Sequence, residues 1–224
     1  MTTLVSRRQL LAGSAALAAL ALAGCSSSGT RRAAVAAAPE KPRVPPEVLA
    51  MYAARPEEEF PLPAARIDLV DPQFWRQVVP DPTGERPGTV VVDTGNRFLY
   101  LVREDGQAMR YGVGIGRDGF SWSGRARIAY KRKWPKWTPP SEMIAREPDL
   151  EKYRNGMDPG LDNPLGARAL YIFDDGKDTL YRLHGNPEER SIGQAVSSGC
   201  VRLLQQDVID LYERVPNGAP ILVA

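Results

Sequence analysis

Short apolar runs alternate with turn-forming residues along the second half of this chain. Residues 89–93 and 97–102 are apolar runs, and Thr94-Gly95-Asn96 separates them. Glu104-Asp105-Gly106 then separates the second run from a third at 109–113. Runs of this length, bounded by glycine and polar turn residues, are typical of β-strands. The pattern predicts three consecutive strands that pair as a meander.

The same pattern continues to the end of the chain, with one change of period. Further strands are expected at 126–130, 169–173, 179–183 and 220–223. Between 204 and 215, Leu204, Val208, Leu211 and Val215 recur at spacings of four, three and four, which is the period of a helix. Many short strands with few helices favour a mainly β fold. We expect a β-sandwich or barrel with one or two short helices.

The first 24 residues have the layout of an export signal. Arg7 and Arg8 precede an Ala- and Leu-rich run from Leu10 to Leu22. That run is too short to span a bilayer comfortably, which takes about 20 apolar residues. Ser6-Arg7-Arg8-Gln9-Leu10-Leu11 is similar to a twin-arginine signal, although general export remains an alternative.

Cys25 follows this run directly. Leu22-Ala23-Gly24-Cys25 resembles a bacterial lipobox, in which the cysteine is acylated and becomes the mature N-terminus. The alternative is ordinary cleavage at a small-residue site. Either route predicts an exported protein of the periplasm or cell envelope. With Cys25 lipidated, the protein would touch the membrane only through its N-terminal lipid.

Composition divides the rest of the chain into three parts. Residues 25–63 are rich in Ser, Ala and Pro, which offer little to bury and predict a linker. Residues 64–86 are expected to be an N-terminal extension that packs on the domain. Residues 87–224 hold the predicted strands and form that domain.

Charge argues against a nucleic-acid partner. Of the 29 basic side chains, two lie in residues 1–24, and all 27 acidic side chains lie after them, so the chain beyond the signal is neutral. A nucleic-acid-binding protein usually carries a basic surplus. One histidine and two cysteines are also too few for a zinc finger or ribbon, and we expect neither a metal nor a cofactor.

Cys200 and His184 are the candidate reactive groups. Beyond Cys25 they are the only cysteine and the only histidine, and each lies beside a glycine. A neighbouring imidazole can take the proton of a thiol and generate the nucleophilic thiolate. In that case the thiol should ionise well below its ordinary pKa. The helix predicted just after Cys200 would favour the thiolate through its dipole. A lone cysteine is, however, more often a small buried hydrophobic residue.

The flanking sequence resembles a known catalytic signature. Tyr181-Arg182-Leu183-His184-Gly185-Asn186, Ser191-Ile192-Gly193 and Ser197-Ser198-Gly199-Cys200-Val201-Arg202-Leu203 are similar to the signature of bacterial L,D-transpeptidases of the YkuD type. Trp137-Thr138-Pro139-Pro140 and Asn163-Pro164-Leu165-Gly166 resemble further segments of that family. The resemblance covers about 87–224. Ser198 departs from it, because the commonest motif has histidine there.

The resemblance implies a role in peptidoglycan synthesis, cell-wall biogenesis and cell shape. Cys200 would attack the bond between the L-centre of a diamino acid and a terminal D-alanine in a tetrapeptide stem. D-Alanine would leave, and the thioester would pass to an amine acceptor. His184 would act as the base, and the family is also acylated by carbapenems.

Several further residues take candidate roles from this resemblance. The backbone of Gly185 would orient His184, and the amides of Cys200 and Gly199 would bind the oxyanion. Arg202, Ser198 and Trp137 are candidate substrate-binding residues. For Arg202 an internal salt bridge is an equal alternative, since the same guanidinium donors serve either purpose.

Three readings of the function remain open at this stage. The first is the transpeptidase, with another stem peptide or a protein lysine as the acceptor. The second is an L,D-carboxypeptidase or hydrolase that uses the same thioester chemistry with water. The third is a non-catalytic wall-binding lipoprotein. No coiled-coil repeat is present, and we expect a monomer.

Overall fold

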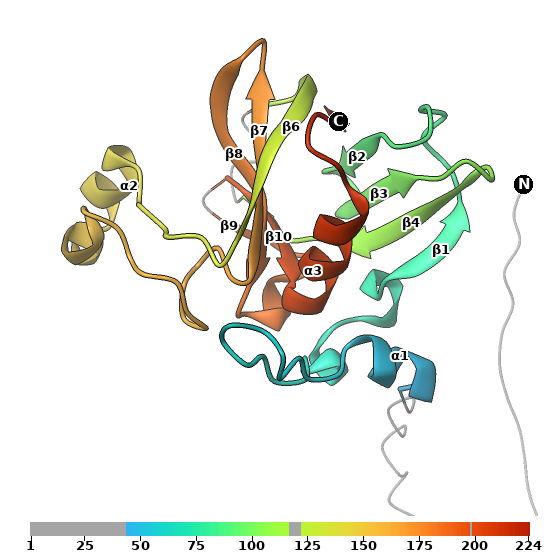
Figure 1. The fold of residues 1–224 in the computed structure, drawn as a ribbon, viewed down its shortest axis with the longest axis horizontal. Helices are drawn as coiled ribbons and strands as arrows, with labels where there is room; N and C mark the ends of the chain where they lie inside the picture. Colours follow the sequence, from blue (N-terminus) through green and yellow to red (C-terminus); the bar gives the residue numbers. More distant parts are fainter. Residues whose placement is uncertain (1–43, 117–121, 198) are drawn as a thin grey trace, which may run out of the picture. The chain divides into compact units, whose positions relative to one another are not determined.

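The computed structural model describes residues 44–116, 122–197 and 199–224 (Figure 1). The predicted export signal, the first part of the predicted linker (residues 25–43, with Cys25) and Ser198 lie outside the described residues.

One large mixed sheet dominates the described part of the chain. Its strands run in the order β1-β4-β3-β2-β11-β6-β7-β8-β10. Their bounds are β1 Gln77–Pro80, β2 Val90–Asp93, β3 Phe98–Val102, β4 Gln107–Gly112, β6 Gly124–Lys133, β7 Arg168–Asp174, β8 Lys177–Asn186, β10 Val201–Leu204 and β11 Pro220–Val223. A second, two-stranded sheet pairs β5 (Ile115–Gly116) with β9 (Ala195–Ser197).

The mainly β prediction is confirmed, and so are the strands that the apolar pattern marked. β2, β3 and β4 pair antiparallel in sequence, which is the expected meander. β11 at the end of the chain lies between β2 and β6, parallel to the first and antiparallel to the second. The last strand therefore joins the meander to the β6–β8 part of the sheet.

Helix α3 (Gln205–Arg214) fills the centre of the fold, where the pattern predicted a helix over 204–215. In Figure 1 it lies between the β6–β8 part of the sheet and the β1–β4 part. Its Val208 and Leu211 are fully buried in the main core with Tyr111 of β4 and Leu183 of β8. Because α3 packs on both parts, it fixes their positions around one core.

Short helices and loops surround the sheet. They are α1 (Pro46–Met51), α2 (Ser141–Arg146) and the 3-10 helices η1 (Ile67–Leu69), η2 (Pro72–Phe74), η3 (Pro148–Tyr153) and η4 (Glu189–Ser191). α2 and η3 belong to an excursion between β6 and β7, on the left of Figure 1. None of the helices among the described residues is long and apolar enough to cross a membrane.

Residues 44–76, here called the strap, pack against the end of the sheet. Val48, Tyr52, Ile67 and Val70 are buried and form a cluster with Leu204 of β10. Part of this strap lies in the 25–63 range that composition assigns to a linker. Composition averages over a window, and here a few apolar residues among many prolines and alanines provide the contacts.

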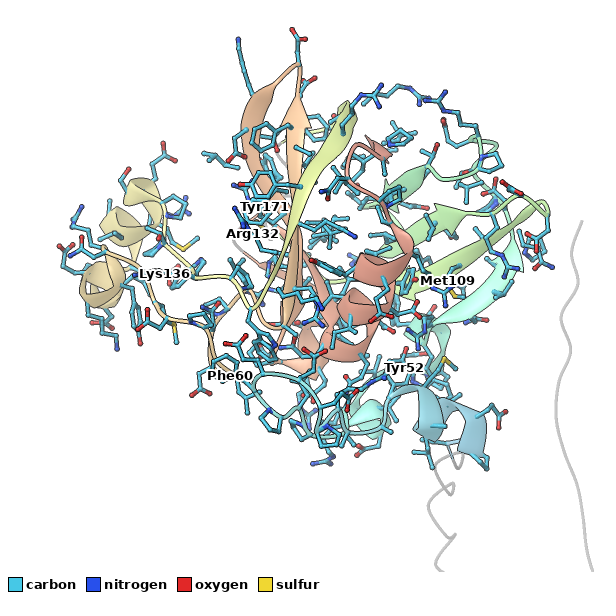
Figure 2. All side chains as sticks on the ribbon, viewed as in Figure 1. Tyr52, Phe60, Met109, Arg132, Lys136 and Tyr171 are labelled. Atoms are coloured by element: carbon cyan, nitrogen blue, oxygen red, sulfur yellow. The ribbon has the colours of Figure 1, made fainter. Side chains whose placement is uncertain are left out.

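Polar contacts also fasten the strap to α3. The Tyr52 hydroxyl donates to a carboxylate oxygen of Asp207 at 3.2 Å, and Tyr52 lies between α1 and α3 in Figure 2. Arg76 forms an ion pair with Asp210 at 3.0 Å. Burial raises the pKa of Asp207 to about 7, and the charge of Arg76 acts in the opposite direction. The strap and the helix thus share a buried polar cluster.

A second buried ion pair connects the strap to β7. Glu58 accepts two hydrogen bonds from the guanidinium of Arg168, at 2.6 and 2.8 Å, and one from the Trp134 indole at 3.0 Å. The Arg168 side chain is only 3% exposed. Trp134 is buried, and its ring packs against that of Phe60.

Replacing Glu58 by alanine is expected to lower the free energy of unfolding by about 3 kcal/mol, because a buried guanidinium loses its partner. Chemical denaturation measures the change. Glu57→Ala is the matched control, since the ion pair of Glu57 with Arg55 is mostly solvent-exposed and such pairs contribute less than about 1 kcal/mol. Equal effects of the two substitutions would contradict a structural role for the buried pair.

Candidate active site

The pairing of β8 with β10 brings the two signature segments together. These strands are parallel neighbours, with Val201 opposite Leu183 and Arg202 opposite His184. Cys200 comes directly before β10, so it is level with Arg182. Side chains alternate between the faces of a sheet, and Leu183, Val201 and Leu203 enter the main core. His184 and Arg202 therefore lie on the other face, away from α3.

Two arginines are common neighbours of the thiol and the imidazole. Burial raises the pKa of Cys200 and lowers that of His184, and the charges of Arg182 and Arg202 act downward on both. Arg202 lies opposite His184 across β8 and β10, and the same register places Cys200 beside Arg182. The thiol itself lies 3.9 Å from the carbonyl oxygen of Leu180. The structure thus gathers Cys200 and His184 into one charged environment.

His184 is held by the backbone beside it. Its Nδ1 lies 2.6 Å from the carbonyl oxygen of Gly185. A carbonyl can only accept, so Nδ1 carries the proton and Nε2 is left as the basic nitrogen. His184 is 5% exposed, and burial lowers its pKa to about 4 while the carbonyls of Gly185 and Pro164 raise it. The imidazole is therefore neutral at pH 7.

Cys200 is also neutral in this structure. Burial raises the pKa of its thiol, and the positive charges of Arg182 and Arg202 only partly compensate. This finding corrects the expectation of a thiol that ionises well below its ordinary value. The pair therefore consists of a neutral thiol and a neutral imidazole.

The expected position of Cys200 at a helix N-terminus is wrong. Strand β10 separates it from α3, which begins at Gln205. A helix dipole falls off within about one turn, so it has little effect on this thiol. Gly199 precedes Cys200 with φ of +130°, a conformation that L side chains rarely adopt. The glycine of the motif is thus required by the backbone turn that leads into the thiol.

For Arg202, substrate binding and an internal salt bridge both remain predictions. Its guanidinium lies 3.8 Å from the carboxylate of Glu188, which is 66% exposed, so this ion pair is long and solvated. Arg202 lies beside His184 across the two strands. The position suits a donor to a substrate carboxylate, and the contact with Glu188 does not prevent that role.

Arg182 is a site residue that sequence reasoning did not single out. It donates two hydrogen bonds to Asp178, at 2.7 and 2.8 Å, and its guanidinium stacks on the ring of Tyr171. It also lowers the pKa of Cys200. The sequence could have indicated Arg182, because it lies two residues before His184 and alternation along a strand places both side chains on the same face of β8.

Trp137 and the segment around Asn163 lie at the base of the excursion. Trp137 forms two backbone hydrogen bonds with Met157, and its ring packs near that of Tyr153, so its substrate-binding role stays a prediction. Asn163 is fully buried and donates to the backbone carbonyls of Pro135, Met157 and Asp158. This residue secures the loop whose Pro164 carbonyl faces His184.

A pocket of about 190 Å³ lies further along the same strands. Its lining includes Asn186 of β8, Leu204 of β10, Gln205 of α3 and residues 62–65 of the strap. Neither Cys200 nor His184 lines it, so it does not mark the reacting atoms. The strap therefore closes the end of the face that carries the reactive pair.

Comparison with known proteins agrees with the motif. Residues 87–223 match the family model described as YkuD, the L,D-transpeptidase catalytic domain. The chain is 32% identical over 182 residues to the probable L,D-transpeptidase YbiS of Escherichia coli K12, covering 76% of this chain and 54% of YbiS. It is 32% identical over 137 residues to a putative L,D-transpeptidase of Fuscovulum blasticum, covering 60% of this chain and 68% of that relative.

A solved structure is also similar in sequence. It is described as a probable carnitine operon oxidoreductase from Brucella melitensis, is 46% identical, and has a TM-score of 0.49. The match covers 69% of this chain and 96% of that chain. This chain spans about half the length of the first curated relatives that it matches.

Proposed function

Because this chain belongs to the L,D-transpeptidase catalytic domain family, we propose that it is a cysteine-dependent acyltransferase that acts on peptidoglycan stem peptides. The donor would be a tetrapeptide stem, cleaved between the L-centre of its diamino acid and the terminal D-alanine. One observation carries the proposal: a buried neutral imidazole with its Nδ1 fixed at 2.6 Å from the Gly185 carbonyl shares its arginine neighbours with the Cys200 thiol.

In the first half-reaction Cys200 would attack the donor carbonyl. The Sγ proton passes to Nε2 of His184 as the S–C bond forms, which avoids a separate thiolate in the resting enzyme. Backbone N–H groups at Gly199 and Cys200 would receive the oxyanion. The C–N bond then breaks, the imidazolium proton goes to the departing amine, and D-alanine leaves a thioester on Cys200.

In the second half-reaction an acceptor amine would attack the thioester. His184 takes a proton from the amine, the new amide forms, and the S–C bond breaks. That proton returns to the sulfur, so the enzyme is restored without any cofactor. An amine on a second stem gives a cross-link, whereas water as the acceptor gives hydrolysis.

The positive groups beside the reactive pair support an acidic substrate. Arg202 lies next to His184, and among the described residues its guanidinium forms a long ion pair with the exposed Glu188. A guanidinium can bind a carboxylate through two parallel hydrogen bonds, and stem peptides end in a carboxylate. Arg202 would thus hold the donor end of the substrate.

The proposal also includes a place of action. A peptidoglycan substrate lies outside the cytoplasm, which is consistent with the export signal predicted for residues 1–24. We propose the periplasm or cell envelope, with attachment through lipid at Cys25. Labelling cells with a clickable fatty acid tests the anchor, since Cys25→Ala should remove the label.

Mass spectrometry of products from a purified tetrapeptide muropeptide tests the reaction. Release of D-alanine together with cross-linked dimers supports the transferase. Tripeptide without dimers would replace it by an L,D-carboxypeptidase. Unchanged substrate together with an unlabelled Cys200 after exposure to a carbapenem would point instead to a wall-binding protein without activity.

A further inference from the structure

Gln205, the first residue of α3, is packed against the backbone of the candidate active site. The residue is 9% exposed. Its Oε1 accepts a hydrogen bond of 2.9 Å from the amide of Ala167, which lies just before β7. The side chain therefore turns from the helix toward the strands and the loop beside His184, and not toward solvent.

Two glycines leave the space that this side chain occupies. A Cβ added to Gly185 would lie 2.3 Å from Oε1 of Gln205, and one added to Gly166 would lie 2.4 Å from the same atom. Real Cβ atoms do not approach other atoms so closely. The carboxamide thus lies directly on the backbone at both positions, and neither glycine can accept a side chain while Gln205 stays in place.

Both of these backbone segments hold His184. The carbonyl of Gly185 accepts from Nδ1 at 2.6 Å. The loop that ends at Gly166 contributes the Pro164 carbonyl, which also raises the pKa of the imidazole. Gln205 contacts the two segments from α3, and Asn163 secures the start of the loop from the excursion. The two carbonyls that hold the imidazole thus belong to segments that both pack against Gln205.

We propose that Gln205 is a positioning residue that fixes the tautomer and orientation of His184 through Gly185 and the 164–167 loop. Gln205 does not touch the reacting atoms. Its carboxamide prevents the two carbonyls from moving apart, so that Nδ1 keeps its proton and Nε2 stays the basic nitrogen. The effect on rate rests on the proposed acyl transfer, whereas the effect on the imidazole can be measured without any substrate.

The chain makes this measurement simple, because His184 is its only histidine. In a ¹⁵N spectrum of the imidazole, every histidine ring signal comes from His184. The native protein should show one tautomer, with the proton on Nδ1. Gln205→Met keeps the side-chain length and removes the acceptor for the Ala167 amide. It should give a mixture of tautomers and slow carbapenem acylation at pH 7 roughly tenfold.

Gln206→Met is the matched control. Gln206 is the next residue of the same helix and is 2% exposed, but its amide donates to strap carbonyls, including that of Pro63 at 3.0 Å. This substitution should cost similar stability and leave the tautomer and the rate unchanged. If Gln205→Met does not fold, Gln205→Ala, which leaves space and introduces no clash, takes its place in both measurements.

The pH dependence separates positioning from general damage. Above the thiol pKa, solvent removes the proton, so the defect of the Gln205 variant should shrink. A single Nδ1–H tautomer and a native rate in the variant would overturn the proposal, as would equal defects in the Gln206 control. If the native protein shows no acylation, the proposed function fails, and the tautomer comparison still decides the role of Gln205.

Discussion

Replacing Cys200 by serine should abolish acyl transfer and leave the fold intact. Serine is nearly isosteric with cysteine, so packing before β10 is preserved. A hydroxyl is a far weaker acid and nucleophile than a thiol, and the burial that already raises the pKa of Cys200 would act on the hydroxyl as well. We expect a loss of at least about a thousandfold in turnover.

Product mass spectrometry and carbapenem labelling measure this loss, with thermal unfolding as the control for folding. The native protein should carry the carbapenem adduct on the peptide that contains Cys200, and Cys200→Ser should carry none. A serine variant with turnover close to the native value would remove Cys200 from the role of nucleophile. A lowered melting temperature would instead indicate that the thiol has a structural role.

His184→Gln should slow acylation at pH 7 by roughly a hundredfold, because the variant has no base to take the thiol proton. The native pair is neutral at this pH. Its rate should therefore change little above pH 5 and fall as the imidazole becomes protonated near pH 4. In the variant the reaction depends on thiolate formed by solvent, and burial places that ionisation above the ordinary thiol pKa. The rate of the variant should thus rise steeply toward alkaline pH.

A pH series of carbapenem acylation, read as adduct mass against time, distinguishes the two profiles. Because the thiol and the imidazole interact, each apparent pKa belongs to the pair and not to one residue. Coinciding native and variant profiles would show that His184 does not activate the thiol. The arginines beside Cys200 would then be the remaining source of activation.

The strands of this fold could be predicted from sequence because each is a short apolar run between turns. The helix was predictable because Leu204, Val208, Leu211 and Val215 follow one period. β10 was missed, since four residues beside a motif show no period of their own. That omission also produced the wrong expectation of a helix dipole at Cys200.

The glycine-flanked motifs singled out Cys200 and His184, and their catalytic roles stay a prediction. The electrostatics around the two side chains could not be predicted from the sequence. The thiol pKa depends on burial and on Arg182. Arg182 lies near Cys200 because β8 pairs with β10, and the sequence pattern does not predict that pairing. The packing of the strap before residue 64 was missed for a similar reason. Tyr52 is buried and Glu58 is partly buried because α3 and β7 present partners for them.

The parallel pairing of β8 with β10 also determines the stage of folding at which the Cys200 thiol and His184 come together. The hairpins β2–β3, β3–β4 and β7–β8 close through short turns, whereas a parallel pair requires the chain to travel back along the whole strand. Residues 187–200 must complete that path before Arg202 lies opposite His184. Closing such a connection costs chain entropy that only the finished contacts repay. A refolding molecule should therefore close its short-turn hairpins before its thiol can react.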